Sequence, residues 1–379
     1  MLPFSLKHLG LTLGFAAMMG ATVAKAAEYD DKSAVIFAYF AVGNDDSPSS
    51  SIRTEQFAQQ IAELTSGGYN VLPLPQIVDA FVAGQPLPPH TVAITFDGAD
   101  KSILRDAVPL LEDHDLPFTV FIPADRIESD KPPFMGWGDL RRLKRTGLAS
   151  FGLHPASYSR LADNRADEIK RQINNSLAAI RKELDINVTL FAYPYGEYDE
   201  SYKKVVKTLG FKAAFGQQSG VAWSGDDRYA LPRFTLTERY GDMDRFTMTA
   251  NALPLPATDI SPEDPHLKSL TPSIGFTVPE DMAKSLKSLS CFSSTEEKPE
   301  LQILGNRVEI RMNKPFHEDR PRINCTMPVA GTAPAEEPRF RWLGMMYTVP
   351  QDLLDDAAMA EQSKIQKHAG NPNDSINME

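Results

Sequence analysis

Residues 92–96, Val-Ala-Ile-Thr-Phe, form an uninterrupted apolar run that is followed at once by Asp97 and Gly98. Runs of β-branched and aromatic residues that end at turn residues are typical of strands buried on both faces of a parallel sheet. The same pattern recurs between residues 34 and 236, with helix-period segments in between. The other clear strands cover residues 34–39, 118–122, 148–153, 190–193 and 213–215.

This alternation predicts parallel strands joined by crossover helices. The longest helix has apolar residues at spacings of three and four, which make one buried stripe: Ile169, Ile173, Leu177, Ile180 and Leu184. At least six strand and helix units favour a barrel over a short open sheet. We therefore expect an α/β fold, a distorted (β/α) barrel, whose chemistry lies at the face where the strands end.

The first 26 residues have the pattern of a secretory signal peptide. Lys7 and His8 precede the apolar run 9–19, and the small-residue site Ala24-Lys25-Ala26 follows. Because the apolar run is too short to span a membrane, we expect residues 1–26 to be removed on export to the periplasm or the cell exterior. A buried N-terminal helix is the alternative.

Composition narrows the functional classes. The 379 residues are 42% hydrophobic and 23% charged, which is ordinary for a globular chain. The net charge of −11 makes nucleic acid and anionic lipid poor partners. The two cysteines, Cys291 and Cys325, both lie late in the exported part, where an oxidising compartment favours a disulfide. Free buried thiols are the alternative.

The alternation stops after Ala250. Residues 253–265 are rich in proline and are interpreted as a linker. Short strand-like runs follow and predict a small antiparallel β domain that holds both cysteines. We expect the polar segment after residue 350 to lack fixed structure. The predicted organisation is a signal peptide at 1–26, a barrel at 27–255, a β domain at 256–350 and a tail at 351–379.

Three short motifs fall where predicted strands give way to loops. They are Thr-Phe-Asp-Gly-Ala-Asp at 95–100, His-Pro-Ala-Ser-Tyr at 154–158 and Tyr-Pro-Tyr-Gly at 193–196. Each has an ordinary structural explanation when taken singly, as a capping carboxylate, a structural histidine or a packing turn. Their joint occurrence on one alternating scaffold favours a shared site.

Together these motifs resemble those of the NodB-homology polysaccharide deacetylases, carbohydrate esterase family four, across residues 34–255. The runs at 191–198 and 230–234 are similar to exported bacterial members that deacetylate N-acetylglucosamine polymers, and residues 322–326 to an extension found in some of them. The resemblance implies a barrel of the polysaccharide deacetylase type. It also implies a hydrolase of carbon-nitrogen bonds other than peptide bonds, acting on an N-acetylated polysaccharide or oligosaccharide.

The resemblance further implies a divalent metal, zinc or a similar ion, that is held by one aspartate and two histidines and activates water. Asp97 then matches the general base, His154 the first metal-binding histidine, and Tyr195 the turn whose backbone N–H holds the oxyanion. Four residues are assigned to substrate contacts. Tyr193 and Pro194 belong to the third motif, Arg233 belongs to the 230–234 run, and the ring of Trp223 suits a sugar face.

Two positions depart from the family pattern. Gly98 stands where the metal-binding aspartate belongs, and Tyr158 stands where the second histidine belongs. A catalytic metal normally needs three protein ligands and one open position. Tyr158 could ligate only as phenolate, whose formation at pH 7 costs roughly 4 kcal/mol for a pKa of about 10. Asp100 is the nearest spare carboxylate and gives an Asp100-His154-Tyr158 metal site if the loop is remodelled.

Two hypotheses follow. The first is an exported, metal-dependent deacetylase of an N-acetylated glycan. The second is a metal-free relative of the cell envelope, a pseudoenzyme without a cofactor, that keeps the sugar cleft and binds glycan. Both depend on one geometric expectation, that positions 97, 98, 154 and 158 converge on a single pocket.

Overall fold

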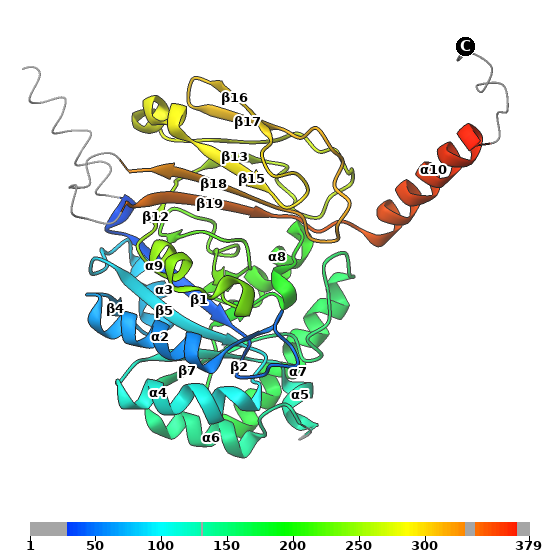
Figure 1. Ribbon diagram of the computed structural model, residues 1–379. Helices are drawn as coiled ribbons and strands as arrows, with labels where there is room; N and C mark the ends of the chain where they lie inside the picture. Colours follow the sequence, from blue (N-terminus) through cyan, green and yellow to red (C-terminus); the bar gives the residue numbers. More distant parts are fainter. Residues whose placement is uncertain (1–28, 130–131, 330–337, 370–379) are drawn as a thin grey trace, which may run out of the picture.

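The computed structural model describes residues 29–129, 132–329 and 338–369, and the proposed signal peptide lies outside them. Within these ranges the expected α/β barrel is confirmed as a curled, mostly parallel sheet that forms an incomplete barrel (Figure 1). Its strands run in the order β10-β1-β5-β6-β7-β8-β9, with β11 beside β1 and β4 beside β5. The six main strands agree with the predicted ranges to within one residue: β1 (Ser33–Tyr39), β5 (Thr91–Asp97), β6 (Phe118–Ile122), β7 (Ala149–Leu153), β8 (Leu190–Ala192) and β9 (Ala213–Phe215).

The remaining strands of this half are two residues long: β2 (Ala41–Val42), β3 (Ser51–Ile52), β4 (Asn70–Val71), β10 (Ala222–Trp223) and β11 (Phe234–Thr235). The helices that connect and cover the sheet are α2 (Thr54–Ser66), α3 (Leu74–Ala83), α4 (Val108–Asp113), α5 (Ala124–Glu128), α6 (Trp137–Thr146), α7 (Ala166–Leu184), α8 (Glu200–Thr208) and α9 (Met243–Ala250). The largest apolar cluster lies between the sheet and the outer helices, among them α2, α6 and α7. A second cluster lines the inside of the curled sheet, where α3 packs.

The predicted C-terminal β domain is confirmed as two four-stranded sheets, in the orders β12-β19-β18-β15 and β13-β14-β17-β16, above the barrel in Figure 1. One apolar cluster draws residues from both sheets and includes Cys291 and Cys325, which are joined by the expected disulfide across paired strands. The strands are β12 (Leu253–Pro254), β13 (Thr258–Ser261), β14 (Ile274–Thr277), β15 (Ser290–Ser293), β16 (Glu300–Leu304), β17 (Arg307–Arg311), β18 (Arg322–Pro328) and β19 (Phe340–Met346).

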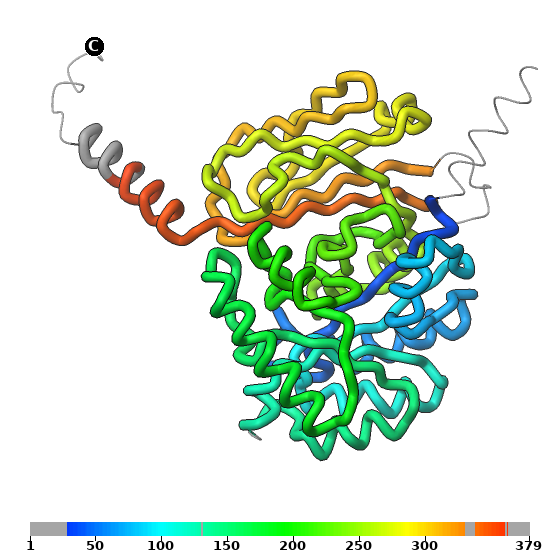
Figure 2. The backbone as a smooth tube through the Cα atoms, turned by 180° about the vertical axis from the view of Figure 1, so that it is seen from behind, coloured from blue at the N-terminus to red at the C-terminus, as the bar shows by residue number. Residues whose placement is uncertain are grey.

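Two segments differ from the sequence-based expectation. The proline-rich residues 253–265 include β12 and β13, which are edge strands of the two sheets, where missing N–H donors are tolerated. The segment expected to lack structure begins with the helix α10 (Gln351–Ala369), which projects from the body of the molecule (Figure 2). Leu353 and Leu354 at its start pack against the C-terminal core, and its alanine, glutamate and lysine residues favour helix.

Helix α8 begins at a cap that also ties two loops together. The Asp199 carboxylate accepts hydrogen bonds from the backbone N–H of Tyr202 at 2.6 Å and of Asp163 at 2.9 Å. We expect Asp199→Ala to lower the free energy of unfolding by about 1–2 kcal/mol, because both donors lose their acceptor. Urea unfolding measures the change, and Asp113→Ala, at an exposed carboxylate in α4, is the control with little effect.

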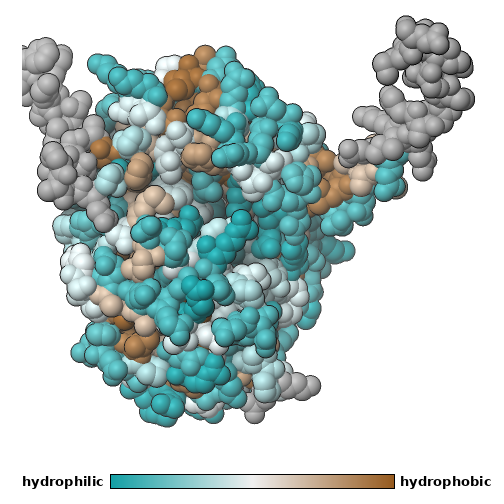
Figure 3. All heavy atoms as spheres, viewed as in Figure 1, coloured by the Kyte–Doolittle hydropathy of each residue, from teal (hydrophilic) through white to brown (hydrophobic). Residues whose placement is uncertain are grey.

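The surface is largely polar in the view of Figure 3, with separate apolar patches at the top, at the lower left and at the right of the molecule. Exposed large apolar side chains of β16, Ile303 and Leu304, belong to the C-terminal half of the chain. Among the described residues, no helix combines the length and the apolar character that a membrane span requires.

Candidate active site

Asp97 ends β5, and its side chain is fully enclosed. Because side chains alternate along a strand, Asp97 and Thr95 share one face of the sheet. Two nitrogens of Arg233 donate to the two carboxylate oxygens of Asp97, each at 2.8 Å. Burial alone would raise the pKa of Asp97, but the charge of Arg233, together with His154, holds that pKa well below its usual range. Asp97 is therefore ionised at neutral pH, and both of its oxygens are already engaged.

Arg233 is a fixed cation behind this carboxylate. It immediately precedes β11, which pairs with β1, and its side chain is fully buried. Its Nε donates to the Gly216 carbonyl at 3.0 Å, and Nη1 also donates to the Thr95 hydroxyl at 3.2 Å. The Phe121 ring lies 5.3 Å from the guanidinium carbon. These contacts leave Arg233 no freedom to turn toward a ligand.

His154 follows the end of β7 and is as deeply buried as Asp97. Its Nδ1 lies 2.7 Å from the Ala192 carbonyl, which can only accept, so Nδ1 carries the proton. Burial lowers the pKa of His154, so the ring is neutral at pH 7 and Nε2 holds a lone pair. This nitrogen is 3.6 Å from the Asp97 carboxylate and has no hydrogen-bond partner among the described residues.

Tyr158 closes over His154, with ring centroids 4.6 Å apart in an edge-to-face arrangement. After Pro155 the chain forms a tight turn rather than a helical one, with Tyr158 at φ +56°. Burial raises the pKa of Tyr158, and the Asp97 charge raises it further. The phenol therefore stays protonated at neutral pH, which makes a phenolate ligand less favourable than the sequence alone suggested.

Gly98 adopts φ +92°, a conformation that favours glycine, and its N–H donates to the Phe121 carbonyl. A Cβ built at this position would lie 3.5 Å from Nη1 of Arg126 in α5. The Arg126 guanidinium stacks over the rings of Tyr158, at 4.1 Å, and Phe134, at 4.8 Å. A permanent cation thus stands beside position 98.

Tyr195 lies on a sharp turn, where it has φ +58° and Gly196 has φ +76°. A Cβ on Gly196 would lie 2.5 Å from the Gln217 nitrogen, so only glycine fits. The turn brings the Tyr195 ring edge-on against Tyr158, with centroids 5.2 Å apart. Arg320, from the C-terminal half of the chain, lies over the other side of the site with its guanidinium carbon 5.7 Å from the Tyr195 centroid.

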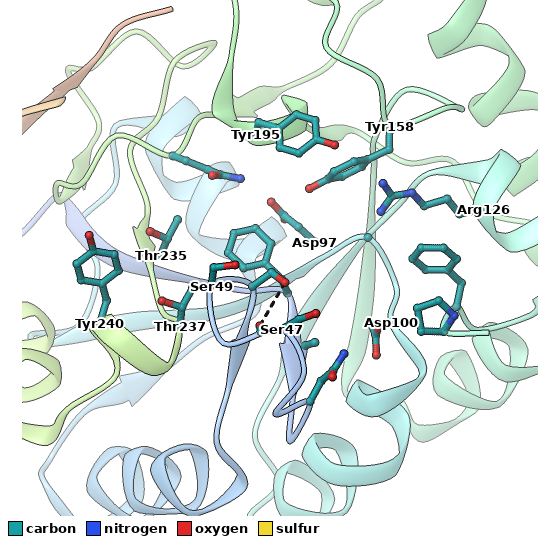
Figure 4. Close-up of a pocket in the computed structure, with 18 of the residues that line it drawn as sticks. Ser47, Ser49, Asp97, Asp100, Arg126, Tyr158, Tyr195, Thr235, Thr237 and Tyr240 are labelled. Atoms are coloured by element: carbon teal, nitrogen blue, oxygen red, sulfur yellow. Dashed lines mark hydrogen bonds between the residues drawn. The ribbon is translucent and has the colours of Figure 1, made fainter. Parts of the chain in front are cut away.

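Asp97, Tyr158 and Tyr195 are among the residues that line a cavity of about 560 Å³, whereas Arg233 and His154 lie behind its wall. Figure 4 shows Asp97 at its centre, Tyr158, Tyr195 and Arg126 on one side and Tyr240 on the other, with the Asp100 carboxylate turned away from Asp97. The lining residues come from the ends of the barrel strands, from the loop 44–50 and from residues 320–322: Phe40, Ala41, Asn44, Ser47, Ser49, Ser50, Asp97, Gly98, Asp100, Arg126, Pro133, Phe134, Tyr158, Tyr195, Gln217, Thr235, Thr237, Tyr240, Arg320 and Arg322.

Residues 84–214 match the family model described as polysaccharide deacetylase. This match supports a polysaccharide deacetylase domain of the NodB-homology type in that part of the chain. Over 213 residues it is 24% identical to the poly-beta-1,6-N-acetyl-D-glucosamine N-deacetylase of Staphylococcus aureus, an alignment that covers 53% of this chain and 73% of that protein. The enzyme of the same name from Escherichia coli is 25% identical over 213 residues, covering 45% of this chain and 32% of that protein.

Solved structures share the fold of the deacetylase domain. The Streptococcus pyogenes deacetylase PplD, in complex with acetate, aligns with a TM-score of 0.53 and 20% identity over 57% of this chain and 98% of that one. IcaB from Ammonifex degensii gives a TM-score of 0.53 and 22% identity over 58% and 97% of the two chains. At these identities the likeness concerns architecture alone.

The donor atoms of this deacetylase domain do not fit the metal that the family implies. Each oxygen of Asp97 already accepts a hydrogen bond from Arg233, and His154 offers a single free lone pair. Asp100 accepts a hydrogen bond from the Ser102 N–H at 2.8 Å. Among the described residues, no group of three or more histidine, cysteine or acidic side chains could hold an ion. The unorthodox site of Asp100, His154 and Tyr158 therefore gains no support from the geometry.

The substrate contacts expected from the sequence lie elsewhere. Tyr193 is fully buried among aromatic rings, and its hydroxyl donates to the Tyr229 carbonyl. Pro194 is also buried, and the Arg233 side chain is fully buried and paired with Asp97. Trp223 lines a second cavity, of about 550 Å³, between the barrel and the C-terminal sheets. We therefore withdraw these four assignments for the cavity at Asp97. Sequence reasoning missed Arg126, Arg320 and Arg322, because their role depends on which residues they meet in space.

Proposed function

We propose that this chain is an exported member of the polysaccharide deacetylase family whose cavity binds an N-acetylated glycan without metal-dependent hydrolysis. The observation that carries the proposal is the Asp97–Arg233 pair beside a lone histidine, because it leaves too few free donor atoms for an ion. The names of the relatives support poly-N-acetylglucosamine as the glycan class. Export is supported by the N-terminal sequence pattern and the disulfide.

The cavity has the size and lining that oligosaccharide binding requires. Its volume of about 560 Å³ lies within the usual range for small-ligand sites, and the half-buried ring of Tyr195 and the ring of Tyr240 offer faces to sugar. Serine and threonine hydroxyls of Ser49, Thr235 and Thr237 line the same space and can exchange hydrogen bonds with sugar hydroxyls.

A metal-dependent deacetylase is the second candidate. It is favoured by the activity named for both relatives and by the closeness of Asp97 and His154, 3.6 Å apart. In that case Asp97 is the base, the Tyr195 turn holds the oxyanion, and Asp100 and Tyr158 would have to move to complete a metal site.

Two measurements separate the candidates. One is calorimetric titration with β-1,6-linked N-acetylglucosamine oligomers, and the other is an assay of acetate release with added Zn²⁺ or Co²⁺. We expect the wild-type chain to bind the oligomers and to release no more acetate than the His154→Ala variant. Release that requires the metal and is lost in His154→Ala would establish the second candidate. Absence of both binding and release would remove the glycan from the proposal.

Tyr195→Ala should weaken oligomer binding by about fivefold, because the sugar loses an aromatic face worth about 1 kcal/mol. Tyr229→Phe is the matched control, since the Tyr229 hydroxyl donates to the Phe211 carbonyl away from the cavity. Equal affinities for the two variants would place the sugar outside this cavity.

A further inference from the structure

The wall of the cavity carries an excess of positive charge. Its charged lining residues are Arg126, Arg320, Arg322, Asp97 and Asp100. Asp97 is already neutralised by Arg233, so one carboxylate remains to face three guanidinium groups. This local excess stands out in a chain whose net charge is −11.

Arg320 is balanced by neighbouring acids. It lies 3.6 Å from Glu197 and 3.9 Å from Asp319, and Arg160 contacts the same two carboxylates at 3.5 and 2.8 Å. Both arginines lie near the Tyr195 ring, at 5.5 and 5.7 Å from its centroid, and the ion pairs attach residues 319–320 to the barrel. Because its charges balance, this group of two arginines and two acids holds residues 319–320 in place and adds no net positive charge to the cavity wall.

Arg322 is different, because no ion pair joins its guanidinium to a carboxylate within the described residues. Burial lowers the pKa of Arg322, and the charges of Arg320 and Arg245 lower it further, while Tyr240 and Glu318 act in the opposite direction. Arg245 stacks on the Tyr240 ring at 5.2 Å, and its Nε is buried with no partner in the part of the chain that the structure describes. Like charges gathered in a half-buried wall are unfavourable unless a ligand supplies the counter-charge.

Arg126 supplies a second unbalanced cation at the other side of the cavity. It is held between the rings of Phe134 and Tyr158, and no ion pair of its side chain is found in residues 29–129, 132–329 and 338–369. The Tyr158 and Tyr195 rings, in contact with each other, separate Arg126 from Arg320. Arg322 interacts electrostatically with Tyr240, which lies across the cavity from Arg126 in Figure 4.

We propose that the glycan bound here is acidic, an N-acetylated polysaccharide whose sugars also carry carboxylate groups, and that Arg126 and Arg322 bind those carboxylates. This inference rests on the proposed function, because it specifies the glycan for the same cavity. Guanidinium groups suit carboxylates through paired N–H donors. The same wall repels free amines, so a fully deacetylated glycan, which is cationic, is a poor ligand.

Hyaluronan oligosaccharides, which alternate N-acetylglucosamine and glucuronate, are the probe. The same oligosaccharides after reduction of the carboxyl groups are the matched neutral ligand, and phosphate-linked N-acetylglucosamine oligomers test phosphate as the anion. Binding of the full chain without its signal peptide is measured by calorimetry at low and high NaCl. The variants are Arg322→Gln and Arg126→Gln, with Arg142→Gln in the exposed face of α6 as the control.

We expect the native oligosaccharide to bind about tenfold or more tightly than the reduced one, since charge-assisted hydrogen bonds contribute about 1.5–3 kcal/mol. Arg322→Gln and Arg126→Gln should each remove most of that difference, Arg322→Lys should retain more of it, and salt should shrink it. Unchanged thermal midpoints would show that the variants are folded.

Equal binding of native and reduced oligosaccharides would overturn this inference and leave the proposed function intact. Stronger binding of the phosphate-linked oligomer than of hyaluronan would overturn the assignment to carboxylate. Failure of these ligands and of the β-1,6-linked oligomers to bind at all would overturn the proposed function as well.

Discussion

Arg233→Met lowers the free energy of unfolding by about 3–5 kcal/mol at pH 7, because it leaves the Asp97 carboxylate buried without its partner. Both side chains are buried, so the lost donors are not fully replaced by solvent. Denaturant unfolding followed by circular dichroism measures the change. Asp97→Asn/Arg233→Met should recover part of the loss, since no charge is then buried alone.

The pH dependence of this effect has a definite sign. In the wild type the folded pKa of Asp97 is depressed, so its contribution to stability is present above the unfolded value of about 3.9 and is lost as pH falls below it. Without Arg233, burial raises that pKa, and the variant loses stability as pH rises. The deficit should therefore be largest near pH 7 and smallest near pH 4. A deficit that does not change with pH would contradict the buried-charge explanation.

Gly98→Asp/Arg126→Ala/Tyr158→His should convert a chain that binds no stoichiometric zinc into one that binds one equivalent. The substitutions add a carboxylate and an imidazole beside His154, and removal of Arg126 frees the space 3.5 Å from position 98. Zinc at 100 times its Kd should then stabilise the variant by about 2.7 kcal/mol. Metal analysis after gel filtration and unfolding with and without zinc provide the measurements.

The backbone at Gly98 sets a cost for this design. An aspartate at φ +92° is strained by about 1–3 kcal/mol, so the metal-free variant should be less stable than the wild type. Gly98→Asn/Arg126→Ala/Tyr158→Phe carries a similar strain without the ligands and should not respond to zinc. Stoichiometric zinc in the wild type, or none in the redesigned chain, would falsify our account of the site.

Sequence patterning was enough to predict the convergence of the site. Asp97 and His154 lie at the carboxyl ends of parallel strands, and such ends meet at one face, so the two residues were expected to be near one another; the structure gives the separation of 3.6 Å. A left-handed turn rather than a helix carries the Tyr158 ring to His154. Local chemistry does not distinguish these two routes.

Assignments that depend on long-range contacts could not be made in advance. Arg233 has the same side chain whether it faces a sugar or a buried carboxylate 136 positions away, and only the pairing of β11 with β1 decides between them. Residues 253–265 were taken for a linker because proline content is a local signal, whereas their role as edge strands depends on the neighbouring sheets.

The sequence by itself determined the barrel, the C-terminal β domain, the disulfide and the depletion of metal ligands at positions 98 and 158, because periodicity and residue type are properties of the chain. Tertiary structure alone decided which charges are paired. Arg233 is paired with Asp97, and Arg320 is paired with Glu197 and Asp319. Arg126 and Arg322 face the cavity without an ion pair among the described residues. Electrostatic balance depends on distance in space, which residue order does not encode.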